Sequence, residues 1–590
     1  MKKITLLVAE TEKENFVFEL RKAGIVHIRR KKAPSSSEIT FIDDKQTKAG
    51  NIINLLLPFQ DKKEGMKKGN MPEQKVRELI EKVEDILEKR VESEREKEMI
   101  GEKLEWFDIW SAFDPEDLKE IREKGVTLKL YKMQKAEYKK IKDNTEHIIA
   151  AKKNGYFYIA ALVRETEKMS SFKEIPVPEG APSTLKKRYQ ELEENITETD
   201  TVLKGSAKYI GSIKTYVEKL AKEKEFLTVQ KGMQEEGSFS CLEGFCPEKK
   251  INKVIALAKE REAGYLIEEP NEPDETPTLI TNPKWIRIID PVFNFMNTLP
   301  GYKEFDISPY FLAFFSIFFA MLIGDAGYGI LFLIITFLVK KKFKNIPREP
   351  FFLMYLLSVA TIIWGAVTGT WFGAEQVARL PFFNAMVIKK ISSFGEGNQN
   401  FIIQICFVIG AVHLTIAHIL RMARVINSPK ALAETGWIMV LWGMFFAAGR
   451  FVLNNPFPYA AMWMLLTGIF LVLVCSNTEK GFIKGALSTL ADLPLSVISS
   501  FSDIVSYLRL FAVGYASVVV AESFNNMALQ GGMNGVISTM GSVLILFFGH
   551  CLNIILGCMA VVVHGMRLNM LEFSGHLGMQ WSGKKYEPFR

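Results

Sequence analysis

Polar and apolar positions divide the chain into two halves of different character. Charged residues crowd the first half, for example at 81–99 and 186–200, whereas the second half carries repeated apolar runs rich in Phe, Leu, Ile and Gly. A chain of 590 residues also exceeds what one hydrophobic core usually serves. We therefore expect a mainly α-helical protein, with a polar α+β domain at residues 1–300 and a polytopic helical membrane domain at residues 301–590.

Strand-like and helix-like patterns alternate in the polar half. Residues 3–30 read as strand, helix and strand, and Gly24 is placed to end the helix. Similar patterns occur around 126–163 and at 239–270. The polar half is therefore expected to contain three small α/β units.

Two long helical tracts separate these units. The first begins at Pro72 and the second near Pro182, and both place apolar residues three and four positions apart. The resulting seams consist of Val76, Leu79, Val83 and Ile86 in the first tract, and of Leu185, Tyr189, Leu192, Ile196, Leu203, Ile210, Ile213, Val217 and Leu220 in the second. We expect the tracts to pair as antiparallel coiled-coil helices with α/β units at their ends, in the form of a dumbbell. The alternative is two unrelated surface helices of a compact domain.

Apolar runs in the second half predict about eight membrane spans. The run at 310–339 is apolar except at 324–329, and as one helix it would measure about 45 Å, longer than the roughly 30 Å hydrocarbon layer. We expect two short helices that turn at Gly324–Gly327, with one tilted span as the alternative. Further spans are expected at 350–373, 400–423, 433–453, 459–475, 494–525 and 536–572, and a shallow amphipathic segment at 481–492.

Basic clusters between the apolar runs orient these spans. They lie at 340–348, 421–430 and 480–484 and in the tail at 583–590, and such clusters usually remain in the cytoplasm. Both termini and the polar half are therefore expected to be cytoplasmic, and the loop at 374–399 to lie on the opposite side. The net charge of +7 is explained by these topology signals, so we expect the lipid bilayer and no nucleic acid as a partner.

Sequence motifs give no sign of an active site. Of six cysteines, four lie in apolar segments, and Cys241 and Cys246 alone are too few for a usual zinc site. The chain has no phosphate-binding loop, no H-E-x-x-H and no nucleophile elbow. We expect no catalytic residue, no metal and no cofactor, so any nucleotide energy must come from another chain.

Arg509 stands inside an apolar run, where a guanidinium costs roughly 3 kcal/mol at mid-bilayer. If the helix runs from 494 to 525, Arg509 lies at its midpoint, too deep to reach either surface easily. One face of that helix is small or polar and is formed by Ser502, Ser506, Arg509, Val513 and Ala516. A smooth face with one charge suits a surface along which a partner slides.

A second polar stripe follows the last apolar run. It consists of His550, Asn553, Gly557, Ala560, His564 and Arg567 at spacings of three and four. Such a stripe on a membrane helix usually lines water or a partner, although Arg567 alone is near enough to the interface to snorkel. On an ideal helix Glu572 falls about 140° from Arg567, so it serves either an aqueous access path or as an interfacial charge.

Four motifs occur in order in the second half: "FFAMLIGDAGYG" at 318–329, "SYLRLFAVGYA" at 506–516, "VHGMRLNMLEF" at 563–573 and "YEPF" at 586–589. Together they resemble the membrane stator subunit of V-type and A-type rotary ATPases, called subunit a or subunit I. The stretch "CLEGFCPEKK" at 241–250 and the dumbbell pattern also resemble that family's cytoplasmic half. The resemblance therefore covers almost the whole chain.

The resemblance implies roles for individual residues in ion translocation between two aqueous half-channels. Arg509 and Arg567 match the family's two membrane arginines, and His564 matches a polar position one turn before the second. Gly557 stands where some relatives carry a carboxylate, so the half-channel is expected to differ there. Asp325 lies in the family's Gly-Asp turn, where we expect a helix-terminus role before a channel role.

The resemblance also implies partners outside this chain. They are a rotating proteolipid c ring with a membrane carboxylate, peripheral stalk subunits, a central-stalk or rotor cap subunit, and the catalytic head. Arg509 is then expected to face the ring carboxylate and not an acid of its own fold. The carried ion, H⁺ or Na⁺, is left open.

Two alternatives belong to other classes of protein. A secondary transporter predicts paired internal repeats with broken helices, and none is seen in the sequence. A membrane-anchored scaffold predicts that the arginines pair with acids of the same chain.

Overall fold

The computed structural model describes residues 1–29, 34, 36–60, 71–110, 120–121, 123, 127–134, 138, 147–153, 155–163, 175–271, 275–343, 346–395, 397–476, 482–530 and 536–590. Val126 and Lys480, which belong to an expected strand and an expected basic cluster, lie outside these residues. The chain forms two compact units. Residues 3–268 with 588–590 form the polar unit, and residues 1–2 with 269–587 form the membrane unit, which holds the apolar helices.

One sheet of the polar unit combines the first and third expected α/β units. Its strands are β1 (Lys2–Ala9), β2 (His27–Ile28), β7 (Phe239–Cys246) and β8 (Gly264–Glu268), in the order β2-β7-β1-β8, and β6 (Gln234–Glu236) pairs with β7. Helix α1 (Lys13–Ala23) ends at Gly24, whose φ of 59° favours glycine. Side chains of α1, of α8 (Ile251–Glu260) and of the strands share one core.

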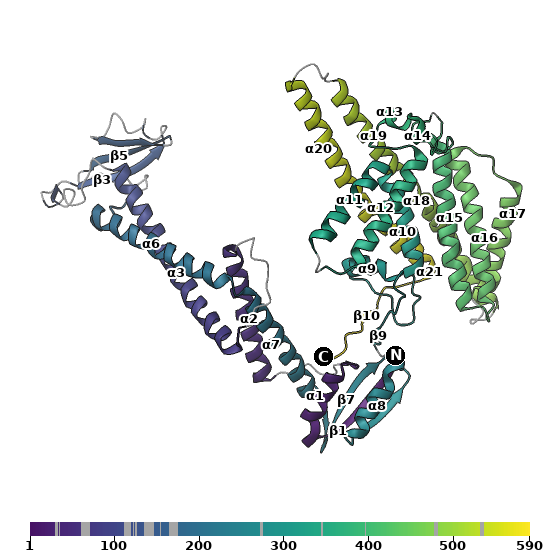
Figure 1. Ribbon diagram of the computed structural model, residues 1–590, viewed down its shortest axis with the longest axis horizontal. Coiled ribbons are helices and arrows are strands. Elements are labelled where there is room, and N and C mark those ends of the chain that lie inside the picture. The colour runs from purple at the N-terminus through teal and green to yellow at the C-terminus, as the bar shows by residue number, and fades with distance from the viewer. Residues whose placement is uncertain are drawn as a thin grey trace. The chain divides into compact units, whose positions relative to one another are not determined.

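Long helices of the polar unit pair antiparallel, as Figure 1 shows for α3 (Glu73–Ile109) and α6 (Pro182–Ala207). Arg90 lies 2.7 Å from Asp200, and Arg188 lies 2.8 Å from Glu96, so the residue numbers run in opposite directions along the pair. The second expected tract is interrupted after α6 and continues as α7 (Ile210–Lys231). Helix α7 packs on α2 (Ser37–Leu56), a helix that the sequence analysis missed.

The middle α/β unit is a sheet in the part that the structure describes. Strands β3 (Thr127–Gln134), β4 (His147–Lys153) and β5 (Tyr156–Val163) form an antiparallel sheet in the order β3-β5-β4. Trp110, directly after α3, stacks edge-on against Tyr158 of β5. The α3/α6 pair thus carries the β3-β5-β4 sheet at one end. Helix α7 packs through Val229 into the core of the other sheet, which contains β1 and β7.

Among its described residues, the membrane unit contains five helical stretches long and apolar enough to cross a membrane, or six if one bent pair counts as a span. The principal helices are α10 (Ser308–Ile323), α11 (Ala326–Lys342), α12 (Glu349–Thr368), α15 (Gln399–Arg424), α16 (Lys430–Leu453), α17 (Tyr459–Cys475), α18 (Phe482–Ser506), α19 (Leu508–Gln530) and α20 (Val536–Ala560). Short elements of this unit are η4 (Arg287–Ile289), α9 (Asp290–Met296), α13 (Glu375–Ala378), α14 (Pro381–Asn384) and the parallel strand pair β9 (Pro277–Thr278) and β10 (Lys584–Lys585). The expected number of eight spans stays a prediction, because α17 has 17 residues and α10 and α11 form the bent pair.

The run at 310–339 is broken where the glycines predicted a turn. Helices α10 and α11 meet at 118° across Gly324 and Asp325, so the chain partly reverses its direction. Gly324 has φ 68°, and Asp325 is the N-cap of α11.

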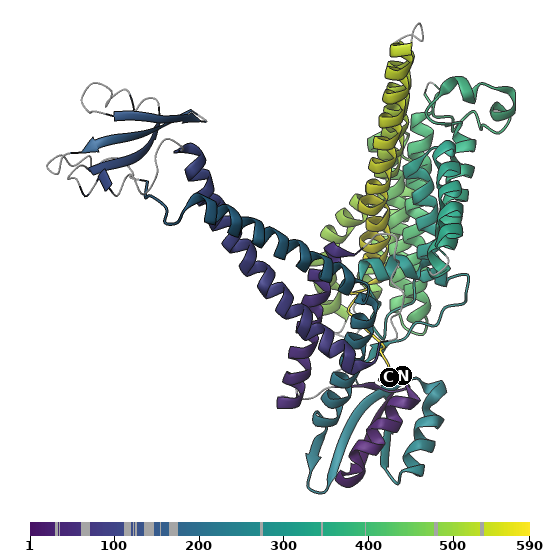
Figure 2. The same cartoon turned by 60° about the vertical axis from the view of Figure 1, so that its left-hand side comes forward.

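The last two apolar stretches differ from the helices expected at 494–525 and 536–572. Pro494 lies inside α18 and does not begin a helix, and the break falls at Tyr507, between α18 and α19. After α20 the chain continues through two π-helical segments, η6 (Val561–Gly565) and η7 (Leu568–Phe573), to α21 (Ser574–Leu577). Figure 1 shows α20 beside α19, and in Figure 2 the two helices overlap in the yellow column. The π segments change which side chains of the last helix point toward Arg509.

Candidate functional site

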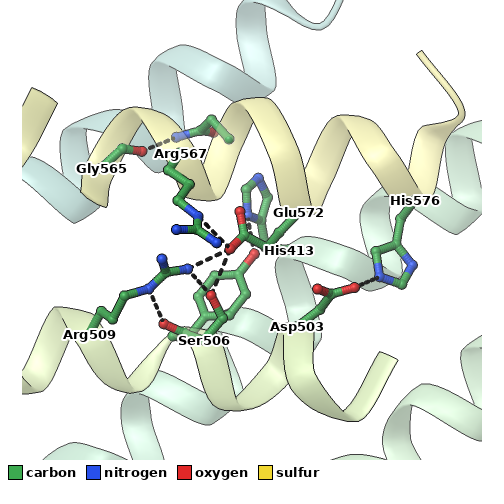
Figure 3. Close-up of polar contacts among 10 residues, drawn as sticks. His413, Asp503, Ser506, Arg509, Gly565, Arg567, Glu572 and His576 are labelled. Atoms are coloured by element: carbon green, nitrogen blue, oxygen red, sulfur yellow. Dashed lines mark hydrogen bonds and ion pairs between the residues drawn. The ribbon is translucent and has the colours of Figure 1, made fainter. Parts of the chain in front are cut away.

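Arg509 binds a carboxylate of its own chain (Figure 3). Its Nη2 lies 2.5 Å from Glu572 Oε1 and also contacts the hydroxyl of Ser506, while its Nε donates to the Ser506 carbonyl at 2.9 Å. Ser506 Oγ donates to the same carboxylate oxygen at 2.6 Å. The expectation that Arg509 faces no acid of its own fold is therefore wrong for the isolated chain.

The π-helical turn explains why the sequence pattern did not place Glu572 beside the arginines. In a π-helix the backbone bond runs from residue i to i+5, so residues five positions apart fall on the same face. Arg567 and Glu572 are five apart across η7, and Arg567 Nε lies 3.8 Å from Glu572 Oε1. The angle of about 140° holds only for an unbroken α-helix. The register of the helix, and not its sequence pattern, places Glu572 between the two arginines.

Burial within this group is unequal. The Glu572 side chain is 5% exposed, that of Arg509 is 24% exposed and that of Arg567 is 55% exposed. Arg509 Nη1 has no hydrogen-bond partner among the described residues. Among the described residues, one guanidinium nitrogen of Arg509 thus has no hydrogen-bond partner, while the Glu572 carboxylate is buried.

Other expected residues of these helices lie in different surroundings. Ser502 is exposed and takes no part in the Arg509 contacts, and His564 Nδ1 is buried without a hydrogen-bond partner in the described part of the chain. Gly557 packs so closely that a Cβ there would lie 2.9 Å from Ile323 Cδ1. A side chain at this position therefore requires the end of Ile323 to shift.

His550 and Asn553 form a second polar group, farther along α19 and α20. His550 lies 2.7 Å from the Tyr328 hydroxyl and 3.1 Å from Asn525 Oδ1. Asn553 donates to the same Tyr328 hydroxyl at 3.1 Å and exchanges hydrogen bonds with Ser517. The predicted stripe is therefore polar and hydrogen-bonded up to Asn553, whereas Arg567, which follows η6, lies near Glu572.

Asp325 closes the turn between α10 and α11. Its Oδ1 accepts from the backbone N–H of Gly327 at 2.8 Å and of Phe372 at 2.9 Å, and its Oδ2 accepts from Gly373 at 2.9 Å. Tyr328 donates a longer bond of 3.3 Å. The carboxylate is 2% exposed and is surrounded by backbone donors, as a helix-terminus role requires.

A third polar group, in which hydrogen bonds connect four side chains in series, was not predicted from the sequence. Glu434 Oε2 lies 2.8 Å from His418 Nδ1, His418 Nε2 lies 3.0 Å from His576 Nδ1, and His576 Nε2 lies 3.0 Å from Asp503 Oδ2. The four residues come from α15, α16, α18 and α21, so no local spacing connects them. A glutamate and a histidine inside apolar helices were the only signal available.

Curated proteins similar to this chain extend over its whole length. V-type ATP synthase subunit I of Borreliella burgdorferi is 32% identical over 100% of this chain and 99% of that protein. This chain belongs to the V-type and A-type ATP synthase subunit I family. V-type ATP synthase subunit I 1 of Treponema pallidum is 29% identical over the same shares, and A-type ATP synthase subunit I of Methanocaldococcus jannaschii is 27% identical over 59% of this chain and 54% of that protein.

Two further comparisons add nothing to the assignment. No protein family model matches the chain. A crystal structure of the cytoplasmic N-terminal domain of subunit I, a homolog of subunit a of V-ATPase, matches 45% of this chain and 100% of that chain with 15% identity and a TM-score of 0.25.

In this subunit I chain, the expected site residues thus fall into separate groups. Ser506, Arg509, Arg567 and Glu572 meet, His550 and Asn553 belong to a second group, and Asp325 caps a helix. Within the described residues no cluster of three or more His, Cys, Asp or Glu side chains could hold a metal ion. The chemistry that these groups offer is the binding and transfer of ions and protons.

Proposed function

We propose that this chain is the stator subunit of the membrane sector of a V/A-type ATPase. It forms two ion half-channels against a rotating proteolipid ring and couples H⁺ or Na⁺ movement to ATP hydrolysis or synthesis by other subunits. The observation that carries the proposal is Arg509, which lies near the middle of the apolar stretch Leu487–Gln530 with one guanidinium nitrogen open.

Arg509 would act on the ring carboxylate by electrostatics. An adjacent cation stabilises the ionised form of a carboxylate, so a carboxylate that approaches Arg509 gives up its ion before it passes. The fixed charge also repels cations that would run directly from one half-channel to the other. Glu572 competes for the same guanidinium and neutralises it between encounters, which keeps each ion pair with the ring transient.

The two half-channels would lie on opposite sides of Arg509. Basic clusters favour a cytoplasmic position for the start of α18 and for the C-terminal tail, and Glu572 would then lie on the cytoplasmic side. His550, Asn553 and Asn525 then lie toward the opposite side. The hydrogen-bonded groups around them support an aqueous path there, because buried polar side chains in a membrane usually line water or a partner.

The remaining parts of the proposal follow the family. Residues 1–300 form a cytoplasmic domain that binds the peripheral stalks and the catalytic head, and the central-stalk or rotor cap subunit completes the rotor beneath it. Residues 301–590 form the multi-pass membrane domain, with both termini in the cytoplasm. The chain itself carries no catalytic site.

One observation favours a second candidate, a membrane-anchored scaffold. That reading predicts that the arginines pair with acids of the same chain, and Arg509 does pair with Glu572. The two readings differ in what the pair is for: the scaffold needs it for assembly, and the stator needs the charge of Arg509 for coupling.

Replacement of Arg509 separates the two readings. In the complete ATPase complex, Arg509→Ala is expected to abolish ATP-driven ion transport while the complex still assembles. Arg450→Ala on α16 is the matched control, an arginine of the membrane unit that is exposed and outside the Arg509 contacts. Loss of assembly in Arg509→Ala alone indicates the scaffold, and normal transport by Arg509→Ala overturns the stator proposal.

A further inference from the structure

Two buried histidines in the membrane unit bind each other and continue at both ends into carboxylates. The contacts run Glu434–His418–His576–Asp503, with lengths of 2.8, 3.0 and 3.0 Å between the bonded atoms. Side-chain exposure along the chain is 8% for Glu434, 4% for His418, 11% for His576 and 27% for Asp503. The middle of the chain is therefore closed to bulk water.

The two ends of this hydrogen-bonded series, Glu434 and Asp503, lie in different surroundings. At one end Arg421, 48% exposed, forms an ion pair with Glu434, with 3.0 Å between Nε and Oε1. This end belongs to the helix termini with the basic cluster at 421–430. At the other end Asp503 precedes Ser506 by one helical turn, and His576 follows Glu572 by four residues. Figure 3 shows Asp503 and His576 beside the Arg509–Glu572 pair, on the same two helical stretches. The hydrogen-bonded series thus runs from residues near the basic cluster at 421–430 to Asp503, one helical turn before Ser506 of the Arg509 site.

We infer that the ion carried by this subunit is the proton, and that the chain Glu434–His418–His576–Asp503 is its access path on the cytoplasmic side. This inference rests on the stator function proposed above and names the ion that the function leaves open. The central link joins two imidazole nitrogens, each of which can donate or accept a proton.

Proton transfer along the chain is balanced. A proton binds Glu434, the proton held in each of the three hydrogen bonds moves to the next acceptor, and Asp503 releases one proton at the inner end. One proton is taken up and one is released, so the net charge of the four side chains is unchanged. Rotation of the side chains back to their first hydrogen-bonded arrangement completes the cycle.

A sodium ion does not fit this path. Hard cations are held by oxygen ligands such as carboxylates, carbonyls and water. The narrowest link here offers only imidazole nitrogens in direct contact, with no space for an ion between atoms 3.0 Å apart. A proton needs no such space, because it moves within the hydrogen bond.

The first test uses the unmodified ATPase complex in liposomes. ATP-driven acidification is expected in sodium-free buffer, unchanged by added sodium, with no accumulation of radioactive ²²Na⁺. Accumulation of ²²Na⁺, or ATP hydrolysis that requires sodium, overturns the inference and leaves the stator function standing. If instead Arg509→Ala transports normally, the stator function itself has failed.

The second test addresses the path. His418→Ala in the complete complex is expected to lower proton transport by about a hundredfold, the usual scale for loss of a proton-transfer group. Added imidazole is expected to restore transport, whereas pyrrole, which has a similar shape but no accepting nitrogen, is not. Thr415→Val, one turn away on α15 and outside the chain, is the control. Normal transport by His418→Ala, or equal rescue by pyrrole, overturns the path; if the variant does not assemble, the sodium test decides.

Discussion

Arg567 and Glu572 approach within 3.8 Å although five residues separate them, because a π-helical segment brings them to one face of the last helix. The same carboxylate oxygen lies 2.5 Å from Arg509. Glu572 therefore stands between the two arginines that match the family's membrane arginines. A residue that sequence spacing had placed apart becomes the centre of the site.

Glu572→Gln is expected to impair coupling more than assembly. The amide keeps the size of the side chain and a hydrogen bond from Ser506, but it leaves Arg509 without its counter-charge. Removing one partner of a buried ion pair costs about 3–5 kcal/mol, and the 24% exposure of Arg509 lowers that figure. ATP-driven transport should fall severalfold in complexes of normal subunit composition.

Arg567→Ala provides the comparison for Glu572. Its longer contact and 55% exposure predict a contribution of about 1 kcal/mol or less to stability. A thermal unfolding measurement on both variants ranks the two pairs. Equal destabilisation by Arg567→Ala and Glu572→Gln would contradict the unequal roles assigned to the arginines.

Asp325→Asn tests the turn between α10 and α11. The asparagine oxygen can replace Oδ1, but its NH₂ group then faces the N–H of Gly373, which currently donates to Oδ2. Leaving buried donors unsatisfied costs about 1–3 kcal/mol, so the melting temperature of the purified subunit should fall. Asp492→Asn, at an exposed position of α18, should leave it unchanged. An unchanged melting temperature in Asp325→Asn would refute the capping role.

Gly514→Ala tests the contact between α10 and the helix of Arg509. A Cβ at Gly514 would lie 2.3 Å from the Met321 carbonyl oxygen, so the two helices must move apart. Such overpacking usually costs about 1–3 kcal/mol. Gly541→Ala on α20 meets no atom within 4 Å and should be neutral or slightly stabilising, as alanine favours helices. Similar melting temperatures for the two variants would show that the approach of α10 and α19 is not tight.

Local features of the fold were predictable from the sequence, and features that depend on register or distant contacts were not. The break at Gly324 and Asp325 was found because a glycine with positive φ and an N-capping aspartate are coded within a few residues. The seam of α3 and α6 followed from spacings of three and four. The π segments carry no such periodic signal, and they decide where Glu572 lies.

The histidine chain shows the same limit. His418 and His576 are 158 residues apart, and their contact depends on how α15 packs against the C-terminal helix α21. Helix α2 was missed for a related reason, since its buried residues leave a polar gap between Ile42 and Ala49. In each case tertiary packing supplied the information that the sequence pattern lacked.

Cys246 should react slowly with thiol reagents. Its side chain is fully buried, and burial raises the pKa of its thiol from near 9.0 to about 11, although nearby Lys250 opposes the shift. Since the thiolate is the reactive form, a rise of two units lowers its population about a hundredfold at pH 8. Peptide-level mass spectrometry after maleimide treatment should show slower labelling at Cys246 than at Cys241, which is partly exposed. Equal rates in the native protein would contradict this, and both should react after unfolding in urea.

Cysteines introduced in place of Lys341 and Lys390 test the membrane topology through the accessibility of their thiols. The 118° angle between α10 and α11 turns the chain back toward the side from which it came, so Lys341 at the end of α11 is expected in the cytoplasm. Helix α12 then carries the chain across, which places the exposed Lys390 on the opposite side. In a variant whose native cysteines are replaced by serine, Lys390→Cys should react with a membrane-impermeant maleimide in intact cells. Lys341→Cys should react only after permeabilisation. The reverse result would mean that α10 and α11 cross the membrane once, and the orientation of every later helix, Arg509 included, would be inverted.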